Sequence, residues 1–261
     1  MAGLLATRTI VLIHGLWVTT ESWAPFKARY EAAGYRVHTP TWRVLQGATA
    51  EQLNRQPPRA LGRLTIGEIV DGLQAYVEAL PEPPLLVGHS FGGLFVQLLL
   101  DRGVGVAGVA LNPAPIAGVV HGPTTLTAAL PIIARWNGWS RPYRFSRERF
   151  GARYANAAPK AQQDEAYDSY VIPTSGRAVA QAALWLGTGV DPKRRTAPLL
   201  ITAGDADRLI TPYMSKAAYR LQRRSPARTD YRMFRGRSHL LIAEPGWEEV
   251  ADEALAWARA L

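Results

Sequence analysis

Short apolar runs recur along the chain, separated by segments whose apolar residues follow a helical period. The first run, Thr9–Ile13, is rich in β-branched residues and uninterrupted, as expected of a strand covered on both faces. Five further runs are expected to form strands: Arg36–Thr39, Leu85–Val87, Val106–Leu111, Leu199–Thr202 and Tyr231–Phe234. Because strands that alternate with helices favour right-handed βαβ units, the pattern predicts an α/β fold. Its sheet should be mostly parallel, with about six strands and helices on both faces.

The clearest helix signals precede the strand at Leu85. Thr65 and Glu68 form a capping-box pattern, in which each side chain satisfies a backbone amide left free at the start of a helix. Pro81 ends this helix. Its apolar residues share one face: Ile66, Ile69, Val70, Leu73, Val77 and Leu80.

Three other segments are also predicted to be helical. Phe91 to Leu100 is apolar almost all round, which indicates a buried helix. Trp247 to Leu261 is amphipathic and is entered through Pro245-Gly246. An earlier helical stretch ends at Gly34, whose place suits the left-handed residue that follows many helices.

Residues 112–198 differ in composition from the rest of the chain, because they mix proline, glycine, arginine and many aromatic residues. A structureless loop of that length is improbable inside a compact domain. We therefore expect a helical cap over 112–198, inserted into a core made of 1–111 and 199–261.

Several classes of protein are disfavoured by the composition. Met1 to Val18 is apolar, but it lacks a basic start and is interrupted by His14-Gly15, so we interpret it as a mature buried strand rather than a signal peptide. The chain has no uninterrupted run of 18 apolar residues, so no membrane span is expected. The absence of cysteine excludes disulfides and thiolate chemistry and agrees with a reducing compartment, so a cytoplasmic location is expected.

The net charge of +9 raises the question of a nucleic-acid partner. Basic residues cluster at Arg135–Arg153 and Arg220–Arg228, but no nucleic-acid-binding motif accompanies them. Only four of the 30 basic residues are lysine, a usage that coding bias can produce. A solvated basic surface without a nucleic-acid partner is the favoured interpretation, and attraction of anionic substrates is the alternative.

Gly88-His-Ser-Phe-Gly92 lies between an expected strand and an expected buried helix. In that context a sharp turn displays the Ser90 hydroxyl above the sheet, and the flanking glycines allow close backbone packing. Ser90 is therefore the candidate nucleophile, the alternative being a turn whose serine only caps the helix.

A serine hydroxyl needs a base to take its proton. His239 follows the last expected strand, where a loop can return its imidazole to Ser90. The orienting acid should follow the strand before that one, where Asp205 and Asp207 both stand. Asp207 lies farther into the loop and is preferred, although Arg208 could compete for it. Asp205 is the alternative and is expected to brace the loop or face solvent.

Four segments of the chain resemble the motifs of the α/β-hydrolase superfamily. They correspond to its oxyanion loop, nucleophile elbow, acid loop and histidine loop: His14-Gly15-Leu16-Trp17, Gly88–Gly93, Gly204-x-x-Asp207 and Gly236-x-x-His239. The resemblance covers nearly the whole chain. Within the superfamily, the chain is similar to minimal six-stranded members such as plant methylesterases and hydroxynitrile lyases. It implies the α/β-hydrolase fold and favours Asp207 as the acid.

The resemblance also implies an oxyanion hole made of the backbone amides of Leu16 and Phe91. Trp17 and His89 neighbour these elements and are the candidate substrate contacts. The side chains of Leu16 and Trp17 can equally form the pocket wall, and His89, like His14, also suits a structural or hydrogen-bonding role.

The expected function is that of a serine hydrolase acting on a small carboxylic ester, lactone or related acyl substrate through an acyl-enzyme. The aromatic cap favours an apolar or aromatic substrate, unless its aromatics only pack against each other. No cofactor or metal is expected, since neither a metal-spaced cluster nor a Gly-x-Gly-x-x-Gly stretch occurs. The alternatives are a hydroxynitrile lyase, a cofactor-free dioxygenase or an acyltransferase with the same triad, and a non-catalytic ligand receptor.

Overall fold

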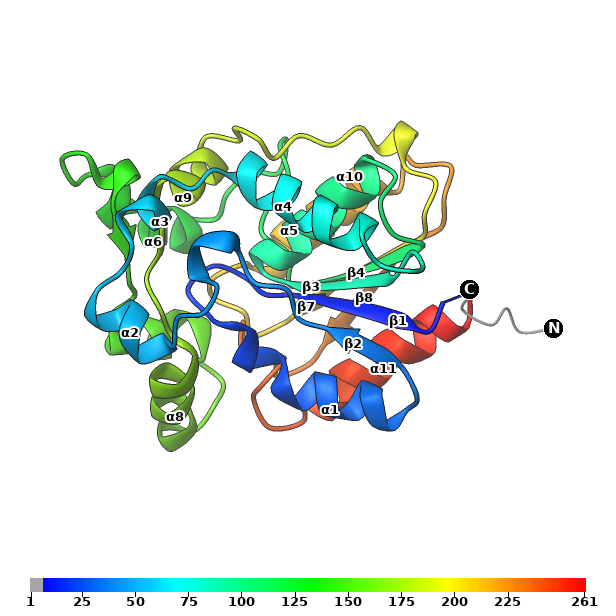
Figure 1. Cartoon of the computed structure of the whole chain (residues 1–261), viewed down its shortest axis with the longest axis horizontal. Coiled ribbons are helices and arrows are strands. Elements are labelled where there is room, and N and C mark those ends of the chain that lie inside the picture. The colour runs from blue at the N-terminus through cyan, green and yellow to red at the C-terminus, as the bar shows by residue number, and fades with distance from the viewer. Residues whose placement is uncertain (1–6) are drawn as a thin grey trace.

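A single parallel sheet forms the centre of the molecule. The computed structural model describes residues 7–261, and within them the six main strands follow the order β2-β1-β3-β4-β7-β8 with every neighbouring pair parallel (Figure 1). The strands are β1 (Thr9–Ile13), β2 (Arg36–His38), β3 (Leu85–His89), β4 (Ala107–Leu111), β7 (Leu199–Gly204) and β8 (Thr229–Phe234). The predicted parallel sheet of about six strands is confirmed. Part of the stretch interpreted as a mature strand, residues 1–6, lies outside the described residues.

Helices cover both faces of this sheet, as expected. One face carries α4 (Ile66–Glu78), α5 (Phe91–Asp101) and α10 (Pro212–Gln222), and the other carries α1 (Ala24–Ala32) and α11 (Trp247–Arg259) (Figure 1). Side chains of β1 alternate between the two cores: Val11 and Ile13 enter one, Ile10 and Leu12 the other. A strand buried on both faces reads as a continuous apolar run for this reason.

The helix signals of the sequence have the expected structural counterparts. Thr65 caps α4: its hydroxyl accepts from the Glu68 amide at 3.1 Å, and its own amide donates to Glu68 Oε2 at 2.8 Å. α5 is buried from Phe91 to Leu100. Gly34, which follows α1, has a φ of +85°, the left-handed conformation expected there.

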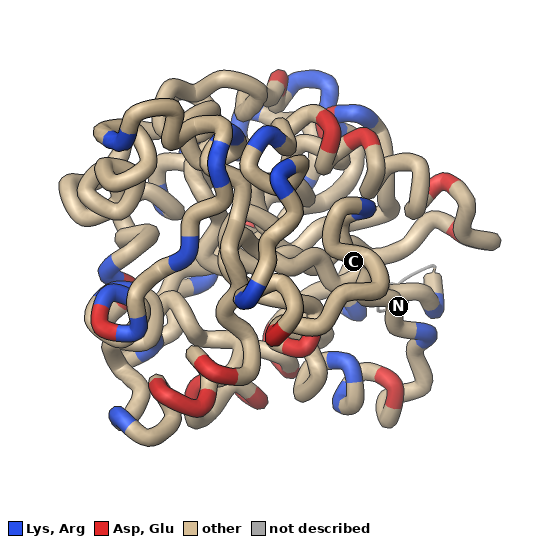
Figure 2. The backbone as a smooth tube through the Cα atoms, turned by 60° about the vertical axis from the view of Figure 1, so that its left-hand side comes forward, with Lys and Arg blue, Asp and Glu red and all other residues tan. Residues whose placement is uncertain are grey.

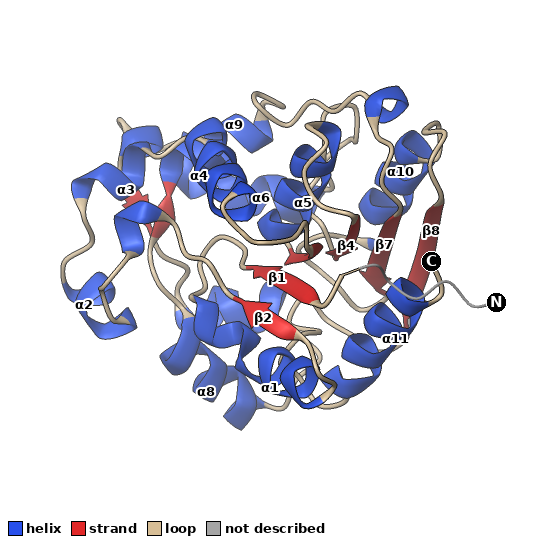
Figure 3. Cartoon of the chain, turned by 45° about the vertical axis from the view of Figure 1, so that its right-hand side comes forward, coloured by secondary structure: helices blue, strands red, loops and turns tan. Residues whose placement is uncertain are grey.

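Residues 112–198, which we call the cap segment, connect β4 to β7. They contain α6 (Pro123–Ile133), α7 (Arg147–Arg149), α8 (Lys160–Tyr170), α9 (Gly176–Ala183) and a short antiparallel pair, β5 (Pro142–Tyr143) with β6 (Thr174–Ser175). The cap segment lies beyond the carboxyl ends of β1 and β3 together with α2 (Ala50–Arg55) and α3 (Arg59–Arg63), and Figure 3 shows the strand pair beside α3. Within the described residues, no helix is both long and apolar enough to cross a membrane.

Candidate active site

Ser90 occupies a strained turn between β3 and α5. Its φ of 56° and ψ of −120° lie outside the conformations that side-chain-bearing residues favour. A Cβ on Gly88 would lie 2.1 Å from the Gly92 oxygen, and one on Gly92 would lie 1.9 Å from the Ile13 oxygen. Only glycine therefore fits on either side of the serine. The Ser90 amide donates to the Leu111 oxygen at 3.0 Å, which ties the turn to β4.

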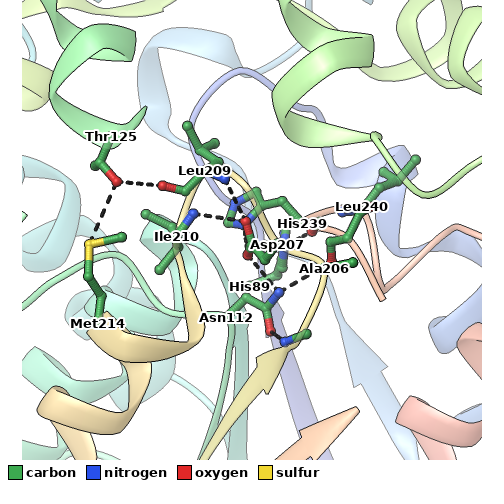
Figure 4. A network of polar contacts seen from close by, with 12 residues as sticks. His89, Asn112, Thr125, Ala206, Asp207, Leu209, Ile210, Met214, His239 and Leu240 are labelled. Atoms are coloured by element: carbon green, nitrogen blue, oxygen red, sulfur yellow. Dashed lines mark hydrogen bonds and ion pairs between the residues drawn. The ribbon is translucent and has the colours of Figure 1, made fainter. Parts of the chain in front are cut away.

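His239 and Asp207 form a buried pair in the loops that follow β8 and β7. His239 Nδ1 lies 2.6 Å from Asp207 Oδ2, and the other carboxylate oxygen accepts from the amides of Leu209 and Ile210, each at 2.8 Å (Figure 4). A carboxylate that accepts from Nδ1 fixes the tautomer in which Nε2 carries the lone pair. Among the described residues, His239 Nε2 is buried without a hydrogen-bond partner, the Ser90 hydroxyl included. It is therefore available as a base.

The structure distinguishes the two acids considered from the sequence. Asp205 is exposed, and its Oδ1 accepts from the Gly236 amide at 2.6 Å, so it braces the loop that follows β8. Asp207 is the aspartate that contacts His239. Within residues 7–261, Arg208 forms no ion pair with Asp207, so the competition considered from the sequence is not seen.

Asn112, the first residue after β4, was not singled out by sequence reasoning. Its Nδ2 donates to Asp207 Oδ2 at 2.8 Å and to the Ser238 oxygen at 3.3 Å, while its Oδ1 accepts from the Gly204 amide at 2.9 Å (Figure 4). One buried amide thus joins the acid loop to the histidine loop and holds the carboxylate that contacts His239. The only sequence signal was a polar residue directly at the end of a buried strand.

The His239 ring is packed between two aromatic side chains. The His89 ring lies 4.8 Å from it, and the Tyr154 ring meets it edge to face at 4.6 Å. His89 Nε2–H also donates to the His239 oxygen at 2.7 Å, and burial lowers the pKa of His89 well below its usual value. A neutral His89 therefore supports the backbone of His239. Tyr154, from the cap segment, was missed by sequence reasoning.

A buried carboxylate also supports the histidine loop. Glu244 is 2% exposed, and its Oε1 accepts from the Ser238 amide at 2.8 Å. Its other oxygen accepts from the Ser238 hydroxyl. Burial raises the pKa of Glu244. The residue before His239 is thus held on one side by Asn112 and on the other by Glu244.

The loop after β1 runs directly against the nucleophile turn. A Cβ on Gly15 would lie 3.0 Å from Ser90 Cβ and 3.5 Å from the Phe91 nitrogen. Neither the Leu16 amide nor the Phe91 amide donates a hydrogen bond within residues 7–261, so both remain free to bind an oxyanion. Next in the loop, Trp17 has a φ of 68°, a second strained residue beside the turn.

His14 has the structural role considered for it. Its Nδ1–H donates to the Gly15 oxygen at 2.9 Å, and its ring stacks on Trp42 with 4.8 Å between the ring centres. Burial lowers the pKa of His14 to about 4. A neutral His14 therefore fixes the start of the loop that carries Leu16.

Ser90 lines an apolar cavity of about 40 Å³. The core contributes the following lining residues: Trp17, Ser90, Phe91, Leu209 and Ile210. The cap segment contributes Ala114, Pro115, His121, Thr125, Leu126, Ala128, Ala129, Val179, Ala182 and Ala183. No aspartate, glutamate, lysine or arginine lines it. Trp17 lies in the wall, as expected of a substrate contact, whereas His89 lies behind His239 and outside the lining, so its placement suits support of His239.

The described residues offer no site for a metal ion. Within residues 7–261, no group of three or more His, Asp or Glu side chains is arranged to hold one. A serine on a strained turn, an imidazole nitrogen without a partner and two free amides, all in the loops that follow β1, β3 and β8, are the groups that nucleophilic acyl transfer requires.

Comparison with known proteins gives a consistent picture. Residues 10–253 match the sequence profile of the Alpha/beta hydrolase family. No curated protein matches the chain. The structure is similar to a monoacylglycerol lipase from Paleococcus ferrophilus, with 20% identity, coverage of 97% of this chain and 94% of that one, and a TM-score of 0.69.

Two other solved structures show the same fold. A methylesterase from Arabidopsis has 15% identity, coverage of 97% and 99%, and a TM-score of 0.68. A pyrethroid hydrolase from Sphingobium faniae has 17% identity, coverage of 96% of both chains, and a TM-score of 0.68. At these identities the likeness concerns the fold.

Proposed function

Because this chain belongs to the alpha/beta hydrolase family, we propose that it is a serine hydrolase that cleaves a carboxylic ester or a related acyl substrate. The observation that carries the proposal is the buried His239–Asp207 pair behind the strained Ser90 turn. Asp207 accepts four hydrogen bonds, from His239, Asn112 and the two amides of residues 209 and 210. These contacts hold the carboxylate in place, so that it orients the imidazole and stabilises it once it is protonated.

The reaction would proceed in two halves. The Ser90 oxygen bonds to the carbonyl carbon as its proton moves to His239 Nε2, and the Leu16 and Phe91 amides stabilise the oxyanion. Collapse expels the alcohol, which takes the proton from His239 and leaves an acyl-enzyme on Ser90. Water then gives a proton to His239, attacks the acyl carbon and releases the acid, returning the proton to Ser90.

The cavity supports a small, uncharged acyl group as the part of the substrate next to Ser90. Cavities of about 150 Å³ admit benzene, whereas this one measures about 40 Å³ and has no charged lining residue. The cap segment, residues 112–198, supplies most of that lining and would act as the cap over the bound ester. Hydroxynitrile lyases often place a lysine in the site, but no lysine lines this cavity, and Lys216 packs on Tyr219 and Tyr231.

The decisive experiment is labelling with a fluorophosphonate probe combined with p-nitrophenyl acetate turnover. We expect Ser90→Ala to lose the label and to lower kcat by at least about a thousandfold. Ser215→Ala is the matched control because Ser215 is also buried and its hydroxyl has no hydrogen-bond partner among the described residues. Turnover that survives in Ser90→Ala, or a label on another residue, would contradict the proposal.

A further inference from the structure

The cap segment displays an unusual number of exposed apolar side chains. Of the twelve large hydrophobic residues that are exposed within residues 7–261, nine belong to it. Trp136 is 86% exposed and Leu130 is 56% exposed. We call the nine residues the cap patch: Val120, Leu126, Leu130, Ile133, Trp136, Trp139, Leu184, Trp185 and Leu186. Single exposed apolar residues are ordinary, but a concentration of them marks an interaction surface.

The members of the cap patch come from neighbouring elements. α6 packs against α9 and against the turn of residues 138–140, so the exposed residues of α6 and those just beyond both elements adjoin one another. His121 stacks on Trp185 with ring centres 5.4 Å apart, and Trp185 Nε1 donates to the Val119 oxygen at 3.0 Å. These contacts attach the segment after α9 to the segment before α6, so the members of the cap patch lie on elements that pack against one another.

This surface adjoins the candidate active site. Leu126 is 47% exposed and also lines the same cavity as Ser90. Ala129 of α6 and Ala183 of α9 line the same cavity from inside. The apolar surface outside is therefore continuous with the apolar cavity beneath it.

Basic side chains border the cap patch. The cap segment contains eleven lysines and arginines and five acids, and two of its basic residues, Arg147 and Lys160, pair with acids of α8. Arg135 directly precedes Trp136, and Arg153 donates to the Thr124 oxygen and the Thr127 hydroxyl of α6. Neither arginine has a carboxylate partner within residues 7–261. Figure 2, with the cap side turned forward, shows several basic residues along the front and a cluster of acidic residues at the lower edge.

We propose that the cap patch docks on an anionic lipid surface, with its tryptophans and leucines in the interface and its arginines against the headgroups. Exposed tryptophan and leucine beside arginine is the combination that binds such interfaces. The docking proposal rests on the composition of this surface and does not depend on the chemistry proposed for Ser90. If both hold, an ester in the lipid layer reaches the cavity through the rim at Leu126.

Charge argues against a second copy of the chain as the occupant. A two-fold symmetric contact through the cap patch would place the same surface on both sides. Arg135 and Arg153 of each copy would then face a surface of equal positive charge, without acids to pair with them. An anionic lipid layer supplies the complementary charge together with an apolar interior.

The test is co-sedimentation of the full chain with vesicles of phosphatidylcholine alone or mixed with phosphatidylserine. We expect binding to the mixed vesicles that weakens with added salt, and much weaker binding to phosphatidylcholine. Trp136→Ser should reduce binding about tenfold, and Arg135→Gln about fivefold. Tyr213→Ser and Met233→Ser are matched controls, because both residues are exposed apolar side chains outside the patch, and neither should change binding.

Two further measurements separate the alternatives. Turnover of soluble p-nitrophenyl acetate should be unchanged in Trp136→Ser and Arg135→Gln, so loss of vesicle binding is distinguishable from loss of the catalytic site. Light scattering should show the same mass for native protein and Trp136→Ser. Three results would each overturn the docking proposal. They are native protein that does not bind phosphatidylserine vesicles, a Trp136→Ser variant that binds them as well as native protein does, and a native dimer that this substitution dissociates.

Discussion

Asn112→Asp is the sharpest perturbation of the candidate site because it keeps the shape of the side chain and changes one donor into an acceptor. The new carboxylate can still accept from the Gly204 amide, which the Asn112 oxygen now does at 2.9 Å. Its other oxygen would replace the amide nitrogen that donates to Asp207 Oδ2 at 2.8 Å. The substitution therefore removes a hydrogen bond to a charged group and adds a like charge beside it.

The expected magnitude follows from that contact. A hydrogen bond to a charged group contributes about 1.5–3 kcal/mol, which corresponds to about a 10- to 150-fold change in rate. We expect kcat/KM of Asn112→Asp to fall within that range.

The assay is p-nitrophenyl acetate hydrolysis from pH 5 to 9, with circular dichroism to verify that each variant is folded. Asn156→Asp is the matched control, because Asn156 donates to the Ala206 oxygen at 2.8 Å and so touches the acid loop without contacting the Asp207 carboxylate. It should retain kcat/KM within about threefold of native. A folded Asn112→Asp variant with native kcat/KM would refute the positioning role of Asn112.

Two other predictions concern stability and acyl-chain length. Because burial lowers the pKa of His14 to about 4, the unfolded chain binds more protons between about pH 6.5 and 4, so the free energy of unfolding should fall by about 3 kcal/mol as pH drops through that window. Urea unfolding checks this, and a His14→Gln variant with an equally steep pH dependence would contradict it. In a p-nitrophenyl ester series, kcat/KM should peak between acetate and butyrate, since the cavity measures about 40 Å³. For octanoate, kcat/KM should be lower by a factor of about ten or more. Val179→Ala, which removes part of the cavity wall, should shift the preference to longer chains; a native enzyme fastest on octanoate would be inconsistent with the small cavity volume.

The sequence was sufficient for features whose signals are local. The four central strands, β1, β3, β4 and β7, read as largely apolar segments, and the glycines around Ser90 indicate the tight turn in which only glycine fits beside it. The boundaries were less accurate: β7 continues to Gly204 and β8 begins at Thr229, because pairing between the two strands extends both. The pair β5–β6 was not predicted, since two-residue strands are formed by contacts with α3 and not by their own periodicity.

What the sequence alone determined was therefore the fold class, and it also supplied the residues that we propose to perform acyl transfer. Tertiary structure decided how those residues are held. Because β4 lies beside β7 in the sheet, Asn112 reaches Asp207 across 95 residues of sequence. The path of the cap segment brings Tyr154 onto His239 and supplies most of the lining of the cavity beside Ser90. Local periodicity carries no information about such contacts, which depend on strand order and on the packing of distant segments.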